Sequence, residues 1–279
     1  MKSLGEILKL SCDYIQSKGS SHSKREVEEL IAHTLNKKRL DLYLNFDKPL
    51  TEPELVLVRK NLSRLAKNEP LQYIEGKVSF YDCTIQVDPR VLIPRPETEL
   101  LVETIVKQIR LQPYENKVLW DICTGSGCIG IAIKKALGTL AVTLSDISSD
   151  ALALAKVNAE QNQVTVDFVQ GDLAEPFRGK KADFIVCNPP YITEDEFIGL
   201  EAHVSGFEPK LALVSGQTGL ECYERLIKAL PSICNPGAVV WFEIGHTQKE
   251  PLLAMVSHLK EPKALQDYSG KDRFITFQI

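Results

Sequence analysis

From residue 117 to the end of the chain, short apolar segments typical of strands alternate with longer segments in which apolar residues recur at helical spacing. This alternation predicts a mostly parallel, doubly wound sheet with helices packed on it. The turn "SGKDR", residues 269–273, comes directly before the last expected strand and indicates an antiparallel edge. The expected strands are "VLWDI", "AVTLSDI", "VTVDFVQ", "DFIVCN", "AVVWFEI" and "RFITFQI".

Residues 1–72 follow a different pattern, which predicts a small helical domain. In three places Ser or Thr precedes Glu by three positions, the spacing of a capping box, and apolar residues at helical spacing follow each pair. The segment "RLDLYLNF" is a candidate for one more helix. The pairs are Ser3 with Glu6, Ser23 with Glu26, and Thr51 with Glu54.

A segment with a shorter period joins these two parts. Residues 77–87, "KVSFYDCTIQV", alternate in the manner of a strand pair. We therefore predict three regions: a helical domain at 1–72, a β-hairpin linker at 73–90, and the domain that contains the sheet at 91–279.

Glycine and acidic residues gather where the expected strands end. The segment "DICTGSGCIG" follows the first strand, and its Gly125 and Gly127 allow a ligand to approach the backbone closely. Asp146 ends the next strand, 19 residues after Gly127 (146 − 127), a spacing that suits hydrogen bonds to ribose hydroxyls. Asp172 follows the third strand and is placed to line an adenine pocket. Because ligands bind beyond the carboxyl ends of such strands, we predict an adenosine cofactor site.

The glycine loop alone is weak evidence for that site. Without a ligand it would be a tight turn between a strand and a helix. A phosphate-binding P-loop would need Gly-Lys-Ser/Thr, which the segment lacks. Taken with Asp146, the loop fits either a dinucleotide or another adenosine cofactor.

The fourth expected strand, which would neighbour the first, ends in "NPPY", residues 188–191. One proline and a glycine would be enough for a turn. Asn188 offers an amide, the two prolines are rigid and lack N–H groups, and Tyr191 offers an aromatic face. The alternative interpretation is a loop that is merely stiffened by proline. The four strand ends together favour a binding site.

These motifs resemble those of S-adenosylmethionine-dependent methyltransferases that act on planar amino groups. The shared features are Asp-x-x-Thr-Gly-Ser-Gly, Asp146 and Asn-Pro-Pro-Tyr. More narrowly, "EPLQYIEGKVSFYDCTIQVDPRVLIPRPETELLVE" is similar to the signature of the PrmC/HemK family, and the resemblance covers nearly the whole chain. Those enzymes methylate the side-chain amide of the glutamine in the Gly-Gly-Gln loop of class I peptide chain release factors. The family usually has glycine where this chain has Cys123.

The resemblance implies a class I methyltransferase fold, which is Rossmann-like with a seven-stranded sheet. It also implies S-adenosylmethionine as cofactor, S-adenosylhomocysteine as product and a class I release factor as partner. Arg95 and Glu97 would support the active site. The cofactor-binding residues that it implies are Cys123, Thr124, Gly125, Ser126, Gly127, Asp146, Asp172, Leu173 and Asn188.

The same resemblance assigns the substrate site to Asn188, Pro189, Pro190 and Tyr191. An amide nitrogen is a poor nucleophile because its lone pair is delocalised into the carbonyl group. If the Asn188 oxygen and the Pro189 carbonyl accept both of its N–H groups, the lone pair is aimed at the methyl group. Tyr191 would pack on the flat amide. Asn188, Pro189 and Tyr191 are therefore the expected catalytic residues.

Charge and composition bear on two rival functions. An adenine or cytosine amino-methyltransferase would face the same planar nitrogen, but it predicts a basic cleft, whereas the formal net charge here is −4. A binding protein without catalytic activity is disfavoured by the intact Asp146, Asn188 and Tyr191. We expect no direct nucleic-acid partner, no membrane association and no metal site. Seven cysteines without a Cys-x-x-Cys pair favour reduced thiols in a cytoplasmic protein.

Overall fold

The computed structural model describes residues 2–20 and 22–279 and divides into two compact units. The first comprises Met1–Gly76 with Glu201–Phe207, and the second comprises Lys77–Leu200 with Glu208–Ile279. Because this division follows contacts in space, a short segment from late in the chain is grouped with the N-terminal residues.

The first unit is helical, and the expected capping boxes form at the start of its helices. At α1, the Ser3 hydroxyl accepts from the Glu6 N–H at 3.3 Å, and the Glu6 carboxylate accepts from the Ser3 N–H at 2.7 Å. The apolar stripes then meet in a small core that includes Leu30, Ile31 and Leu65. The helices are α1 (Leu4–Ser17), α2 (Lys24–Thr34), α3 (Arg39–Leu44), α4 (Glu52–Leu65), α5 (Leu71–Glu75) and α10 (Ala202–Ser205).

The second unit begins with a hairpin, in which β1 (Lys77–Phe80) pairs antiparallel with β2 (Cys83–Gln86). The hairpin starts at Lys77 and not at Tyr73 as expected, because the chain before it forms the helix α5, which ends at Gly76 with φ +74°.

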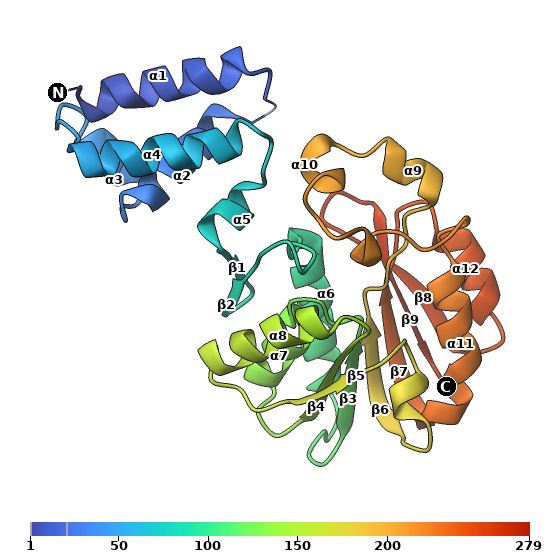
Figure 1. Ribbon diagram of the computed structural model, residues 1–279. Coiled ribbons are helices and arrows are strands. Elements are labelled where there is room, and N and C mark those ends of the chain that lie inside the picture. The colour runs from blue at the N-terminus through green and yellow to red at the C-terminus, as the bar shows by residue number, and fades with distance from the viewer. Residues whose placement is uncertain (1, 21) are drawn as a thin grey trace. The chain divides into compact units, whose positions relative to one another are not determined.

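Seven strands in the described part of the chain form one sheet, with the order β5-β4-β3-β6-β7-β9-β8 (Figure 1). The pairs from β5 to β7 are parallel, whereas β9 is antiparallel to both β7 and β8. The mostly parallel sheet and its antiparallel edge are thus confirmed. The strands are β3 (Val118–Ile122), β4 (Ala141–Asp146), β5 (Asp167–Gln170), β6 (Ala182–Cys187), β7 (Cys234–Glu243), β8 (Lys260–Gln266) and β9 (Asp272–Gln278).

Helices cover both faces of this sheet, which explains why its central strands β3 and β6 are mostly apolar and buried (Figure 1). One face packs against α11 (Glu221–Ile233) and α12 (Lys249–Val256), with Tyr223 and Leu252 in the shared core. The helices on the other face are α6 (Pro96–Ile109), α7 (Cys128–Ala136) and α8 (Ser149–Gln161). None of the helices in residues 2–20 and 22–279 is long and apolar enough to cross a membrane.

The order of the strands fixes where a ligand can bind. The chain moves from β3 to β4 and β5 in one direction, and β6 and β7 lie on the other side of β3. The carboxyl ends of β3 and β6 are neighbours, since Ile122 pairs with Cys187. This is the switch point at which open parallel sheets leave a crevice for ligands.

Candidate active site

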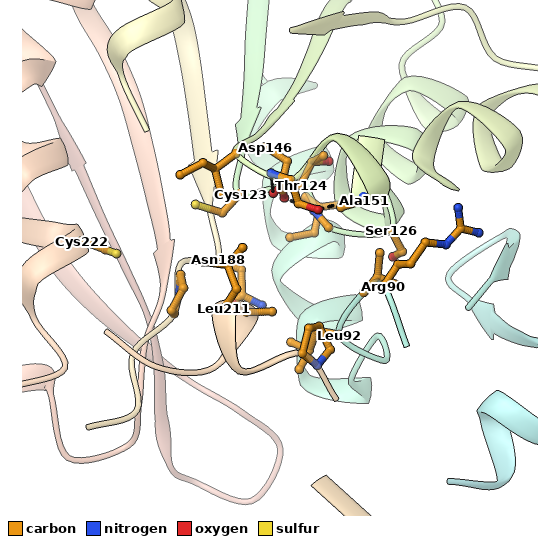
Figure 2. A pocket seen from close by; sticks show the side chains of 18 of the residues that line it. Arg90, Leu92, Cys123, Thr124, Ser126, Asp146, Ala151, Asn188, Leu211 and Cys222 are labelled. Atoms are coloured by element: carbon orange, nitrogen blue, oxygen red, sulfur yellow. Dashed lines mark hydrogen bonds between the residues drawn. The ribbon is translucent and has the colours of Figure 1, made fainter. Parts of the chain in front are cut away.

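A pocket of about 260 Å³ lies at this switch point (Figure 2). Its walls come from the loops that follow β3, β4, β5 and β6, from the segment before α6, and from residues 209–214. The structure brings together here nine of the residues expected in the site. They are Cys123, Thr124, Gly125, Ser126, Asp146, Asp172, Leu173, Asn188 and Pro190.

The loop after β3 exposes its backbone to the pocket. Gly125 has φ +53°, a conformation that favours glycine, and a Cβ added there would meet no atom within 4 Å, so the space beside its Cα is open. Gly127 has φ +83°, and a Cβ would lie 2.8 Å from the Ile131 side chain, so it allows close packing and does not line the pocket. Cys123 also has a positive φ, 59°, which costs a residue with a side chain ~1–2 kcal/mol.

Asp121, at the end of β3, holds this loop from below. One carboxylate oxygen accepts from the Thr124 hydroxyl at 2.6 Å and from the Gly130 N–H at 2.9 Å. The other oxygen, Oδ1, is buried and has no hydrogen-bond partner among the described residues. Burial raises the pKa of the Asp121 carboxyl to about 7, although both hydrogen bonds oppose the shift.

Asp146 connects the end of β4 to the same loop. Its carboxylate accepts from the Gly125 N–H at 2.8 Å and from the Ser148 N–H at 2.9 Å. Burial raises its pKa, and the two backbone donors act against that rise. The carboxylate lines the pocket in a fixed orientation with lone pairs to spare, which is the arrangement needed to accept from hydroxyl groups.

Asp172 lies at the end of β5 and is tied to α11. Its carboxylate accepts from Arg225 at 2.6 Å, and both side chains line the pocket. Leu173, the next residue, has φ +49° and also faces the pocket. The ion pair thus fixes the wall of the pocket between the third strand and a helix from late in the chain, a contact that local sequence patterns do not reveal.

The four residues that follow β6, 188–191, are called the tetrapeptide here, and they do not all line the same pocket. Asn188 and Pro190 line the pocket at the switch point, whereas Tyr191 lines a neighbouring pocket of about 570 Å³, and Pro189 lines neither. In the described parts of the chain, no hydrogen bond engages the Asn188 carboxamide or the Pro189 carbonyl oxygen. The Asn188 carboxamide is therefore available to a ligand in the pocket, whereas Pro189 is buried. The partly buried Tyr191 ring lies near Glu243 and Arg273, and burial raises the pKa of its hydroxyl.

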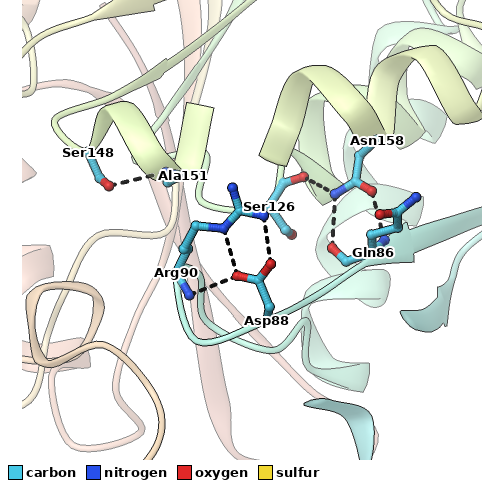
Figure 3. A network of polar contacts seen from close by, with 7 residues as sticks. All are labelled: Gln86, Asp88, Arg90, Ser126, Ser148, Ala151 and Asn158. Atoms are coloured by element: carbon cyan, nitrogen blue, oxygen red, sulfur yellow. Dashed lines mark hydrogen bonds and ion pairs between the residues drawn. The ribbon is translucent and has the colours of Figure 1, made fainter. Parts of the chain in front are cut away.

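The opposite wall contains residues that sequence patterns did not single out. Arg90 and Leu92 line the pocket, and Arg90 forms a bidentate ion pair with Asp88, at 2.6 and 2.8 Å (Figures 2 and 3). Arg95, which the resemblance implied, also lines the pocket and binds Glu208 at 2.6 Å. The fully buried Glu208 side chain accepts in addition from the Ile93 N–H at 3.1 Å. Glu208 thereby holds the segment before α6 against residues 209–214.

Asn158 supports the glycine loop from the side of the hairpin (Figure 3). Its buried carboxamide donates to the Ser126 carbonyl at 2.8 Å and to the Gln86 carbonyl at 3.0 Å, and it accepts from the Gln86 N–H at 2.7 Å. One side chain of α8, Asn158, therefore links the hairpin to the glycine loop by hydrogen bonds. A buried asparagine within an otherwise apolar helix face is the sequence signal that could have identified this role.

Glu243, at the end of β7, is a second buried carboxyl group near the tetrapeptide. It accepts from the Thr98 hydroxyl at 2.7 Å, and its backbone carbonyl accepts from the Tyr223 hydroxyl at 2.6 Å. Burial raises the pKa of the Glu243 carboxyl to about 7, against the effect of the Thr98 hydrogen bond and the nearby arginines.

The residues of the pocket fit an adenosyl cofactor with a cationic amino acid part. The open backbone at Gly125, the fixed Asp146 carboxylate and the apolar Ile147 and Leu173 suit a ribose and a flat base. Within the described ranges, no three His, Cys, Asp or Glu side chains are arranged to hold a metal ion.

Comparison with protein-family models finds two matches. The model described as "PrmC N-terminal domain" matches residues 6–76, and the model described as "Methyltransferase small domain" matches residues 96–201.

Several curated relatives carry the name "Release factor glutamine methyltransferase". One from Chlamydia trachomatis serovar D is 40% identical over 272 residues, which is 96% of this chain and 92% of the relative. One from Geobacter sulfurreducens is 38% identical over 98% of this chain and 96% of the relative. One from Bacillus subtilis is 36% identical over 99% and 97%. These relatives match this chain from end to end.

Among solved structures, the catalytic domain of hMettl16 in complex with MAT2A 3'UTR hairpin 1 has a TM-score of 0.55 at 16% identity, covering 81% of this chain and 80% of that one. A methyltransferase from Pyrococcus furiosus has a TM-score of 0.50 at 18% identity, covering 72% and 90%. At such low identity these structures show that the fold is shared, and nothing about substrate.

Proposed function

The chain belongs to the release factor glutamine methyltransferase family, and from this membership we propose how its residues serve the reaction. The protein is an S-adenosylmethionine-dependent enzyme that methylates a glutamine of a peptide chain release factor. The observation that supports the residue assignment is the Asn188 carboxamide, which has no hydrogen-bond partner among the described residues and lines the same pocket as the glycine loop; the Pro189 carbonyl next to it is also unengaged.

For the cofactor, we assign the pocket at the switch point. Asp146 would accept from the ribose hydroxyls, Asp172 and Leu173 would border the base, and the loop from Cys123 to Gly127 would lie against the amino acid part. When bound, S-adenosylmethionine supplies a methyl group made electrophilic by its sulfonium. Arg225 keeps the Asp172 carboxylate in place for this role.

For the substrate, the chain must hold one side-chain amide with its nitrogen towards the cofactor. The Asn188 oxygen and the Pro189 carbonyl would accept the two N–H groups of the glutamine, which fixes the plane of the amide. Pro189 and Pro190 have φ fixed by their rings, which limits the rotation of the backbone that carries the Pro189 carbonyl. Tyr191 would pack its ring against the flat group. The amide proton becomes acidic only once the nitrogen carries the methyl, so no base is needed at the start.

The proposed partner is a class I release factor, which presents the glutamine on its Gly-Gly-Gln loop. Such a factor is large, and the few groups around one amide cannot provide a specific contact with its body. We assign that contact to the helical domain, residues 1–72. A groove of about 470 Å³ lies there between α1 and α4, lined by apolar residues that include the partly exposed Leu10 and Tyr14. Since release factors act on ribosomes, this partner implies a cytoplasmic location.

Mass spectrometry tests the proposal directly. A class I release factor incubated with the protein and S-adenosylmethionine should gain one methyl group on the glutamine of the Gly-Gly-Gln peptide. The same mixture without S-adenosylmethionine serves as the blank. Methyl transfer to a different residue, or no transfer at all, would contradict the proposed substrate.

A further inference from the structure

The side chain of Gln248 is hydrogen-bonded to the backbone of three segments, one of which is the tetrapeptide. It lies in the loop between β7 and α12 and is only 8% exposed. Its carboxamide nitrogen donates to the Tyr191 carbonyl at 3.0 Å and to the Gly219 carbonyl at 3.1 Å. Its oxygen accepts from the Gly245 N–H at 2.9 Å. Both N–H groups and the oxygen of this side chain are therefore engaged by backbone from three different loops.

The peptide group that Gln248 contacts is held at its other end as well. The Ile192 N–H, which belongs to the same peptide group as the Tyr191 carbonyl, donates to the Leu213 carbonyl at 2.9 Å. The Ile192 carbonyl in turn accepts from the Ser215 N–H at 2.9 Å. With both polar atoms bound, this peptide plane has one orientation, and the orientation sets where the Tyr191 ring leaves the backbone.

Gly219 leaves room for this contact. It has φ +73°, and a Cβ added there would lie 2.4 Å from the Tyr191 carbonyl oxygen and 2.9 Å from the Gln248 nitrogen. Any other residue would push against the two atoms of the hydrogen bond. The glycine thus offers a second way to disturb the same hydrogen bond without changing the Gln248 side chain itself.

We propose that Gln248 is a positioning residue for methyl transfer, which fixes the backbone from Asn188 to Ile192 by holding the Tyr191 carbonyl. This inference rests on the proposed function of the tetrapeptide. Pro189 and Pro190 restrict the rotations between Asn188 and Tyr191, so an anchor at the far end also limits the two acceptor groups at the near end. Gln248 does not line the cofactor pocket, and all its polar atoms are engaged, so it acts through Tyr191.

The test compares Gln248→Met, which removes all three hydrogen bonds, with Gln248→Glu, which keeps the acceptor and loses the donors at neutral pH. Gly219→Ala places a Cβ against the Tyr191 carbonyl oxygen and so disturbs the same hydrogen bond sterically. Gly179→Ala is its matched control, because Gly179 has φ +77° but no atom within 4 Å of an added Cβ. Gln112→Glu, at an exposed glutamine, controls for the added charge.

Calorimetry first gives the affinity and the number of S-adenosylmethionine sites per chain, so that rates are expressed per cofactor-binding molecule. For the three variants we expect kcat on release factor to fall at least about tenfold, with cofactor affinity unchanged. Amide exchange in a peptide covering residues 188–193 should become faster; two of its residues are prolines without N–H, so the signal reports on Tyr191, Ile192 and Thr193. Both control variants should match the wild type.

A Gln248→Met protein with normal kcat per site, or with normal exchange at residues 188–193, would overturn the inference. A loss of cofactor sites in proportion to the loss of rate would do the same, because it would mean that the variant is merely unfolded. If the wild type itself transfers no methyl group to release factor, the proposed function fails instead, and the exchange comparison still decides whether Gln248 holds the tetrapeptide.

Discussion

At the scale of single residues, Asn188 has the most direct expected effect. Its carboxamide has no partner within the described residues and lines the pocket, so its removal should not disturb the fold. We expect Asn188→Ala to lower kcat at saturating release factor by at least about tenfold, because one of two acceptors for the substrate amide is lost. Cofactor affinity should change less than turnover.

The control for Asn188 is Asn235→Ala, at the start of β7 and thus at the opposite end of the sheet. Steady-state rates at saturating substrate are the measurement. A near-normal rate for Asn188→Ala would show that the Pro189 carbonyl alone is enough to orient the amide.

Cys123 has a side chain in a backbone conformation that favours glycine. Its φ of 59° is unfavourable for a side chain, and that side chain lines the pocket. We therefore expect Cys123→Gly to bind S-adenosylmethionine as well as the wild type or better, as measured by calorimetry. A clear loss of affinity would show that the thiol, which packs against the core around Cys187, helps to shape the pocket.

At the scale of elements, sequence patterns predicted the structural features that are determined by residues close together in the chain. The capping boxes at Ser3, Ser23 and Thr51 formed, since such a box lies within one turn of helix. The alternation of strands and helices likewise predicted the sheet and its antiparallel edge. The short helix α9 (Glu194–Ile198) was not predicted, although Thr193 and Glu196 have the spacing of a capping box. Its lack of buried residues left no apolar stripe to detect.

The parts of the site that sequence patterns missed depend on contacts between distant segments. Glu208 meets Arg95 across 113 positions, Gln248 meets Tyr191 across 57, and Thr98 meets Glu243 across 145. An isolated Glu or Gln has no spacing that reveals a partner so far away. Only the fold brings these groups together, and so a single sequence identifies strand ends more readily than their supports.

The contact made by Glu208 can be tested as a link between elements. Glu208→Gln removes the charge from a side chain that is fully buried and accepts from both Arg95 and the Ile93 N–H. We expect the free energy of unfolding to fall by about 1–3 kcal/mol, measured by urea titration, because a buried charge-assisted bond is weakened. The two segments that Glu208 joins also line the pocket, so cofactor affinity should fall as well.

A matched control is Glu194→Gln. Glu194 binds Lys210 at the same 2.6 Å, but the two side chains are 48% and 54% exposed. Exposed ion pairs contribute about 0–1 kcal/mol, so this variant should be close to the wild type. Equal losses for the two variants would argue that burial of Glu208 is unimportant.

At the scale of the whole molecule, two buried carboxyl groups should make stability depend on pH. In the folded protein, Asp121 and Glu243 keep a proton up to about pH 7, whereas in the unfolded chain they release it near their ordinary pKa values of 3.8 and 4.5. Their contribution to stability is therefore complete below those ordinary values and is lost as pH rises towards 7. The free energy of unfolding without cofactor should fall over this interval.

Glu243→Gln removes one of these groups and keeps an acceptor for Thr98. Between pH 5 and 7 its free energy of unfolding should decrease less steeply than that of the wild type, by at most about 1.4 kcal/mol per pH unit. Urea titrations at several pH values measure the slope, with the exposed Glu175→Gln as control. Parallel curves for Glu243→Gln and the wild type would mean that the Glu243 carboxyl is ionised throughout.

The division of labour between the two units gives the last prediction. Every residue that lines the cofactor pocket belongs to the second unit, so changes in the first unit should leave cofactor binding intact. A release factor needs a larger contact than the amide pocket offers. We therefore expect Leu10→Asp and Tyr14→Asp, at partly exposed positions in the groove of α1, to raise KM for whole release factor while kcat changes little.

A short peptide with the Gly-Gly-Gln sequence provides the control substrate, since it cannot reach a docking surface and should be methylated equally by the variants and the wild type. A protein that begins at Lys77 should, if it folds, show the same pattern more strongly, with methylation of whole factor reduced to that of the peptide. The groove substitutions keep the test valid where the shortened protein does not fold. An unpaired carboxylate that is buried in a protein–protein contact weakens binding. If both variants methylate whole release factor with unchanged KM, the groove therefore does not dock the substrate.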